Sequence, residues 1–134
     1  DRVVPCLRGS TADRLRSIFA IHFNFETRRT RLFLAHIAAA YDWTRSPAAM
    51  PYGRNPRLKQ IIFDCLAEGA ARGDVDLGVD LQEAVDLLMA AYAWTYRLAA
   101  WEGADANAMS AVMDRQIGLI SDGLRPRGAA SPLI

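Results

Sequence analysis

The sequence predicts an all-α fold, a helical bundle of about five helices, and two observations support this prediction. Apolar residues recur at the three- and four-residue spacing of amphipathic helices, while the alternation typical of β-strands is nearly absent. Capping residues, glycine and proline stand where that helical spacing begins and ends. The chain has 134 residues, 51% of them hydrophobic, which suits one compact domain.

The first predicted helix covers residues 11–25, because Ser10 is a good capping residue and Asp13 follows three residues later. A second covers residues 27–44 and opens with a basic cluster, Arg28, Arg29 and Arg31. Cations are unfavourable near a helix N-terminus. The cluster therefore indicates either a solvated helix start or a carboxylate partner elsewhere.

The third predicted helix follows a segment rich in proline and glycine, residues 45–56. It begins sharply, since Asn55 is a favourable cap and Pro56 a favourable first helical residue. Gly73 is placed to end it with a positive φ angle.

The fourth and fifth predicted helices cover residues 81–102 and 106–124, with Asp80 and Asp105 as their caps and Gly103 between them. We expect a single domain over residues 10–125. Residues 1–9 then form a linker from an upstream element, and residues 126–134 form a flexible tail. The chain begins at Asp1 rather than Met, which favours a fragment of a longer protein or an N-terminus that lies upstream.

The fourth predicted helix is apolar on more than one side. On a helical wheel its polar residues fall in one narrow sector: Gln82, Glu83, Asp86 and Arg97. The remaining arc spans roughly 200°, about twice the stripe of an ordinary surface helix. One edge of the arc carries Leu87, Ala91, Trp94, Leu98 and Trp101, and the other carries Val85, Met89, Tyr92 and Tyr96. The fifth helix is over-apolar too, so the pattern favours an intermolecular four-helix bundle in a homodimer over a merely central helix.

Few residues suit catalysis or metal binding. The net charge is +1, which gives no strong footprint for nucleic acid or an acidic membrane, and no phosphate-binding glycine loop or Glu-x-x-His motif occurs. His22 and His36 lie in apolar stripes, where a histidine is usually a core residue and less often an anchor for a ligand. A zinc site with Cys65 lacks a fourth ligand, and Cys6 and Cys65 match no metal or redox spacing. We expect no enzyme activity, no cofactor and no metal.

The C-terminal half resembles the effector domain of TetR-family transcriptional regulators. The resemblance rests on LAEGAARGDVDLGVDLQEAVDLLMAAY (66–92), followed by WEGADANAM (101–109) and QIGLISDGL (116–124). The opening STADRLRSIFAIHF (10–23) is similar to the first helix of that domain. The family's N-terminal helix-turn-helix has no match here, since FAIHFNFETR (19–28) lacks the preceding turn and helix.

The resemblance implies a ligand-sensing and dimerisation domain that contacts DNA only through an upstream helix-turn-helix. A small hydrophobic or aromatic effector would alter half-site spacing by moving the first helix. The implied ligand-binding residues are Phe19, Phe23, Phe33, His36, Tyr41, Tyr52, Met89, Tyr92 and Tyr96. The implied dimer interface comprises Leu87, Ala91, Trp94, Leu98, Trp101, Met109, Met113, Gln116 and Ile120.

Two other readings stay open: a small-molecule-binding helical bundle and a dimerisation module with a filled core, both without a DNA partner. The tyrosine hydroxyls favour a pocket with polar handles, because a dry core must satisfy each of them. No apolar run reaches the roughly 18 residues of a membrane span. We therefore expect a cytoplasmic protein without a membrane partner.

Overall fold

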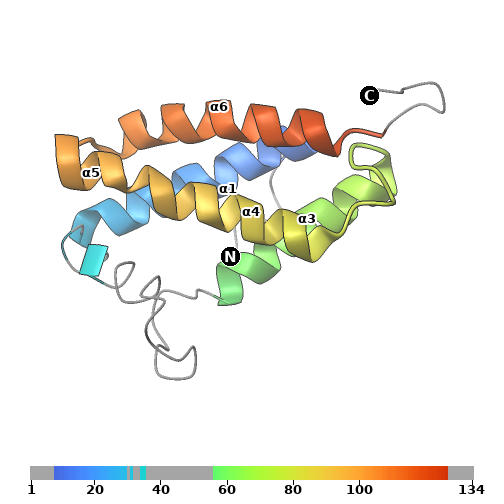
Figure 1. Cartoon of the computed structure of the whole chain (residues 1–134), viewed down its shortest axis with the longest axis horizontal. Coiled ribbons are helices and arrows are strands. Elements are labelled where there is room, and N and C mark those ends of the chain that lie inside the picture. The colour runs from blue at the N-terminus through green and yellow to red at the C-terminus, as the bar shows by residue number, and fades with distance from the viewer. Residues whose placement is uncertain (1–7, 30, 32–33, 36–55, 127–134) are drawn as a thin grey trace.

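The computed structural model describes residues 8–29, 31, 34–35 and 56–126, and these residues form a helical bundle (Figure 1). The elements are α1 (Thr11–Glu26), the short 3-10 turn η2 (Thr27–Arg29), α3 (Pro56–Arg72), α4 (Leu81–Thr95), α5 (Arg97–Glu102) and α6 (Ala106–Leu124). Within the described ranges no strand occurs. The predicted all-α fold is confirmed.

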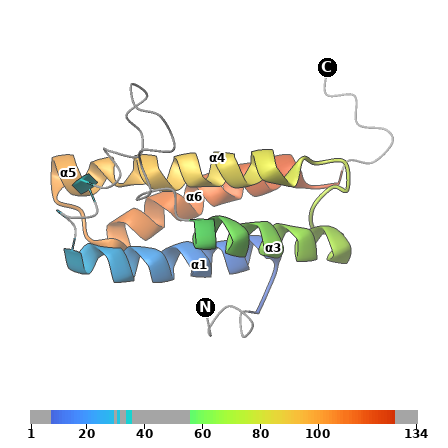
Figure 2. The same cartoon turned by 90° about the horizontal axis from the view of Figure 1, so that it is seen from below.

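The four long helices form a closed ring of neighbours. Helix α1 contacts α3 and α6, and α4 contacts the same two helices from the opposite side. Figure 2 shows α3 running beside α1, with α4 across the bundle. Each helix therefore turns one apolar stripe toward a shared core, and each fully buried aliphatic or aromatic side chain stabilises the fold by roughly 1.5–3 kcal/mol.

Capping residues set the helix ends where the sequence predicted them. The Ser10 hydroxyl accepts a hydrogen bond from the amide of Asp13, whose carboxylate accepts one from the amide of Ser10, completing a capping box. Asp80 accepts hydrogen bonds from two amides at the start of α4, and Asp105 caps α6. Gly103 ends α5 at a φ of 65°, a conformation that glycine adopts without steric cost.

A close approach joins the start of α1 to the end of α3. Gly69 is buried, and a β-carbon at that position would collide with the Thr11 side chain and touch Val75. Thr11 in turn donates hydrogen bonds to Asp74 from both its amide and its hydroxyl, at 3.1 and 2.9 Å. The absence of a side chain at Gly69 therefore lets the two helix ends pack together.

The predicted continuous helix over residues 81–102 is wrong in one respect, because it is broken at Tyr96 into α4 and α5. The Thr95 hydroxyl donates to the carbonyl oxygen of Ala91 at 2.7 Å, a contact that often bends helices. The amide of Tyr96 donates to Ala93, three residues back, at 3.2 Å. The helix thus tightens for one turn before α5 continues.

Several predicted segments fall outside the described residues. These are Asn55 as a cap, most of the linker at residues 1–9, most of the tail at residues 126–134 and most of the helix over residues 27–44. Of that helix, the structure describes the 3-10 turn and three further residues. The arginines of the basic cluster, Arg28, Arg29 and Arg31, are exposed, as a solvated helix start requires.

Candidate functional site

Exposed large apolar side chains lie on three consecutive helices, α4, α5 and α6. Four of them are more than half exposed: Leu87 at 54%, Trp94 at 58%, Trp101 at 71% and Leu119 at 76%. Single exposed apolar residues are ordinary, but a group of neighbouring ones marks an interaction surface. We call these four residues the outer face.

The outer face begins at the edge of α4 that lies next to α6. Thr95 of α4 is buried, and its hydroxyl contacts the Met113 sulfur of α6 at 3.9 Å. Ala91 and Leu98 are half-buried against the core beside it. Helical spacing carries Leu87, Trp94 and Trp101 just beyond this border, so the outer face adjoins α6.

The two tryptophans form one cluster across the helix break. Trp94 lies in the last turn of α4 and Trp101 lies in α5, yet their rings contact each other edge-on with centroids 6.1 Å apart. The Arg97 guanidinium lies 4.7 Å from the Trp94 ring centroid and donates to the Trp94 carbonyl oxygen at 3.0 Å. Edge-on ring contacts and cation–π contacts both orient aromatic side chains, which preorganises the outer face.

The α6 side of the predicted dimer interface needs a correction. Met109 and Met113 are fully buried in the core of the single chain, so they do not reach the surface. Ile120 and Gln116 are half-buried, while Leu119 is the exposed large apolar residue of α6. In the sequence, Met109, Met113 and Ile120 share one helical stripe and Leu119 lies off it. That offset is the signal that could have placed Leu119 on the surface.

A second aromatic cluster lies inside the bundle between α1 and α4. Four of the predicted ligand-binding residues form it: Phe19, Phe23, Tyr92 and Tyr96, each no more than 2% exposed. Their ring centroids lie 5.1–5.3 Å apart in four pairs, the spacing of rings in direct contact. Met89 is also buried in the core. We call the four rings the inner cluster.

The inner cluster contains a buried polar pair. The hydroxyl oxygens of Tyr92 and Tyr96 lie 3.2 Å apart, where either can donate. Burial raises the pKa of both phenols well above the usual value, and the neighbouring tyrosine adds to the rise at Tyr92. Both hydroxyls are therefore neutral near pH 7 and can each donate and accept a hydrogen bond.

The other predicted ligand-binding residues, Phe33, His36, Tyr41 and Tyr52, lie outside the described residues. The structure thus brings together five of the nine predicted ligand-binding residues and packs them as part of the core.

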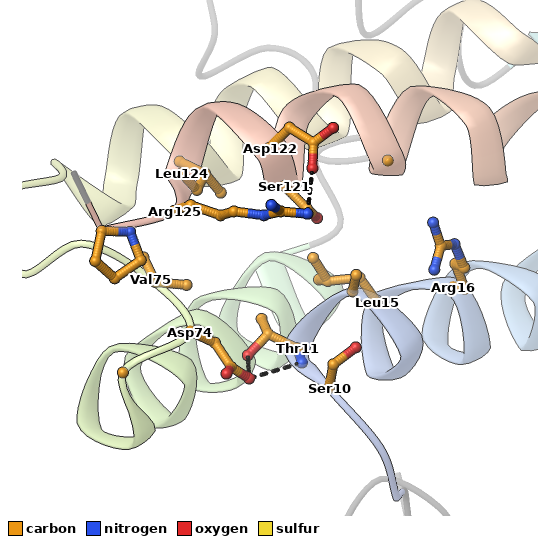
Figure 3. A pocket seen from close by; sticks show the side chains of 14 residues that line it. Ser10, Thr11, Leu15, Arg16, Asp74, Val75, Ser121, Asp122, Leu124 and Arg125 are labelled. Atoms are coloured by element: carbon orange, nitrogen blue, oxygen red, sulfur yellow. Dashed lines mark hydrogen bonds and ion pairs between the residues drawn. The ribbon is translucent and has the colours of Figure 1, made fainter. Parts of the chain in front are cut away.

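A hollow of about 450 Å³ with both polar and apolar lining lies at the end of the bundle, where the sequence predicted no site. Figure 3 shows it between the first turns of α1, the loop after α3 and the last turn of α6. Its polar lining comes mainly from Ser10, Arg16, Asp74, Ser121, Asp122 and Arg125. None of the five predicted ligand-binding residues that the structure describes lines it.

Charged groups around the hollow pair with one another. Arg125 contacts Asp122 at 2.9 Å, and Arg16 contacts Asp13 at 3.4 Å. Asp74 accepts from Thr11 and also lies 3.4 Å from Arg72. The Thr11 hydroxyl and amide, with help from Arg72, hold the pKa of Asp74 below its ordinary value. The contacts among Thr11, Arg72 and Asp74 tie α1, α3 and the following loop together, so this side of the hollow is a structural junction.

The histidine and cysteine in the described ranges behave as the sequence favoured. His22 is half-buried, with Nδ1 at 2.9 Å from the Ile18 carbonyl oxygen one turn back. Cys65 is buried, and desolvation raises the pKa of its thiol to about 11. A thiol that stays protonated is a poor nucleophile. His36 and Cys6 lie outside the described residues.

Neither a metal centre nor a membrane span is found in the part of the chain that the structure describes. There, His, Cys, Asp and Glu side chains gather nowhere in a group of three that could hold a metal ion. No helix of this part combines the length and the apolar character that crossing a bilayer requires.

Comparison with known proteins returned no relative. The sequence matches no protein-family model, no curated protein and no solved structure. The proposed function is therefore inferred from the outer face and the inner cluster.

Proposed function

We propose that this chain is the effector-binding and dimerisation domain of a TetR-like transcriptional regulator, and that the outer face joins two copies of it. The observation that carries the proposal is the group of four exposed apolar side chains on adjoining helices. Regulators of this kind bind DNA as dimers whose two DNA-binding domains must keep a fixed distance. In this proposal the DNA-binding domains are helix-turn-helix units upstream of these residues.

The size of the outer face fits a dimer contact. Its two tryptophans and two leucines expose on the order of 600 Å² per chain, close to one partner's share in a standard protein interface. Tryptophan is also enriched among the residues that dominate binding energy. A second copy of the same face would cover both tryptophans, since a two-fold interface uses one patch twice.

The dimer is tested by native mass spectrometry and light scattering at micromolar concentration. We expect the wild-type chain to be a dimer and Trp94→Arg to be a monomer, because an arginine at the centre of the contact buries an unpaired charge. Leu77→Arg is the matched control. Leu77 is 85% exposed in the loop over residues 73–80, away from the outer face, so this variant should stay dimeric.

Circular dichroism should show the same helix content in all three proteins. A wild-type monomer at micromolar concentration, or a Trp94→Arg variant that remains dimeric, would contradict the proposal.

The effector in this proposal is a small, mainly apolar molecule that contacts the inner cluster. What supports it is the hydroxyl pair of Tyr92 and Tyr96, which places polar atoms among aromatic rings. Such a mixture of apolar walls and few polar handles is typical of ligand sites. Saturable uptake of an apolar fluorophore, abolished by Tyr92→Trp, is the expected result. Unsaturable uptake would count against an effector site.

The direct ring contacts of the inner cluster favour one alternative, a dimerisation module whose core is already filled. In that case the chain still dimerises through the outer face, but it takes up no ligand. The fluorophore experiment separates the two functions, because only the effector-binding domain gives saturable uptake.

A further inference from the structure

One acidic and one basic residue flank the outer face. Glu83 stands in the first turn of α4, and Arg97 is the first residue of α5, where it is held against Trp94. Counted from α4 across the break at Tyr96 into α5, alternating steps of four and three residues join Glu83, Leu87, Ala90, Trp94, Arg97 and Trp101. That spacing keeps residues on one side of a helix.

These two charges are placed symmetrically about a small residue. Glu83 and Arg97 lie seven residues before and seven residues after Ala90. Ala90 is exposed and Ala91 is half-buried. The middle of the row of residues from Glu83 to Trp101 therefore lacks bulky side chains and permits close approach of a second helix.

A two-fold interface brings each side chain of the patch against a residue of the same patch. If both α4 helices crossed with Glu83 near Glu83, two like charges would meet, which disfavours that arrangement. An antiparallel crossing beside Ala90 instead sets each acidic end against a basic end. It also sets Leu87 opposite the partner's Trp94, so that a medium apolar side chain meets a large one.

We propose that the second copy docks antiparallel on α4 with the two-fold axis beside Ala90, so that Glu83 faces the partner's Arg97. This inference rests on the proposed dimer and adds its register and the charge pair that selects it. The pair acts twice in each dimer. Arg97 is positioned for it by its contacts with the Trp94 ring and carbonyl oxygen.

The test is a charge-swap experiment on the whole chain. Glu83→Arg puts two arginines at each contact, and Arg97→Glu puts two glutamates there. We expect each variant alone to dimerise about tenfold more weakly than wild type, because two weak attractions become two repulsions. Sedimentation at low salt measures the dissociation constants, and added salt should reduce the difference.

Mixing the two variants is the decisive step. In a mixed dimer both contacts again join arginine to glutamate, so native mass spectrometry should show the mixed dimer in excess over either homodimer. Each variant carries the same intrachain change in the mixture as alone. A loss of helix stability therefore cannot imitate this rescue.

Asp64→Arg is the matched control. Asp64 is exposed on α3, which carries no residue of the outer face, and its carboxylate accepts from Gln60. This variant should neither weaken the wild-type dimer tenfold nor rescue Arg97→Glu. Rescue by Asp64→Arg would overturn the register.

The two proposals fail in different ways. Dimers of undiminished strength in both single variants, with Trp94→Arg monomeric, would overturn the register and leave the outer face as the interface. A wild-type monomer would overturn both.

Discussion

The segment formed by α4, Tyr96 and α5 presents aromatic side chains on two sides, and the two sides differ in what covers them. On the inner side Tyr92 and Tyr96 are 2% and 1% exposed, because rings from α1 pack against them. On the outer side Trp94 and Trp101 are 58% and 71% exposed; their rings contact each other, and Arg97 lies over the Trp94 ring. The comparison shows that one edge of this segment is buried in the core of the single chain, whereas the other edge stays exposed.

Truncating one ring on each side gives the largest expected contrast. Phe23→Ala leaves a cavity beside both tyrosines and should lower the free energy of unfolding by about 3–5 kcal/mol. Trp101→Ala removes a larger but mostly exposed ring and should change the free energy of unfolding by less than about 0.5 kcal/mol. Urea denaturation of both variants in a Trp94→Arg background measures this without a contribution from dimerisation. Equal losses on the two sides would mean that the outer face stabilises the monomer.

A smaller effect tests the polar pair of the inner cluster. Tyr92→Phe and Tyr96→Phe should each cost about 1 kcal/mol, because each removes a partner from a buried hydrogen bond. The double variant should cost less than the two single variants together, by about 0.5–1 kcal/mol. Thermal and urea denaturation of the four proteins measure this coupling. Strict additivity would show that the two hydroxyls do not depend on each other.

The smallest effect concerns the end of the bundle, where polar groups rather than rings are paired within the chain. The pKa of Asp74 is lower in the folded state than in the unfolded chain, because Thr11 donates to the carboxylate twice. Its contribution to stability is therefore present above about pH 4 and is lost as the pH falls through the lower, folded value.

Asp74→Asn should flatten the acid limb of the stability profile measured by urea denaturation between roughly pH 5 and pH 2. Part of the limb should remain, since the Ser10 amide and hydroxyl also lower the pKa of Asp13. An acid limb identical to that of wild type would show that Asp74 does not contribute through its charge.

Local signals in the sequence were sufficient for most helix ends. Ser10 with Asp13, Asp80 and Asp105 cap helices at the predicted residues, and Gly73 and Gly103 follow helix ends with positive φ angles. A cap depends on residues within one turn of it, so a short window of sequence contains the required information. Periodicity likewise identified both apolar edges of α4.

Contacts between distant segments decided the rest. Nothing local distinguishes the apolar edge that carries Tyr92, which is 2% exposed, from the apolar edge that carries Trp94, which is 58% exposed. The break at Tyr96 and the hollow around Asp74 likewise depend on packing between elements far apart in the chain. The sequence by itself determined which residues form helices and which edges are apolar, because those properties are local. Only the tertiary structure decided which apolar edge this chain covers, since burial depends on neighbours that the fold brings together.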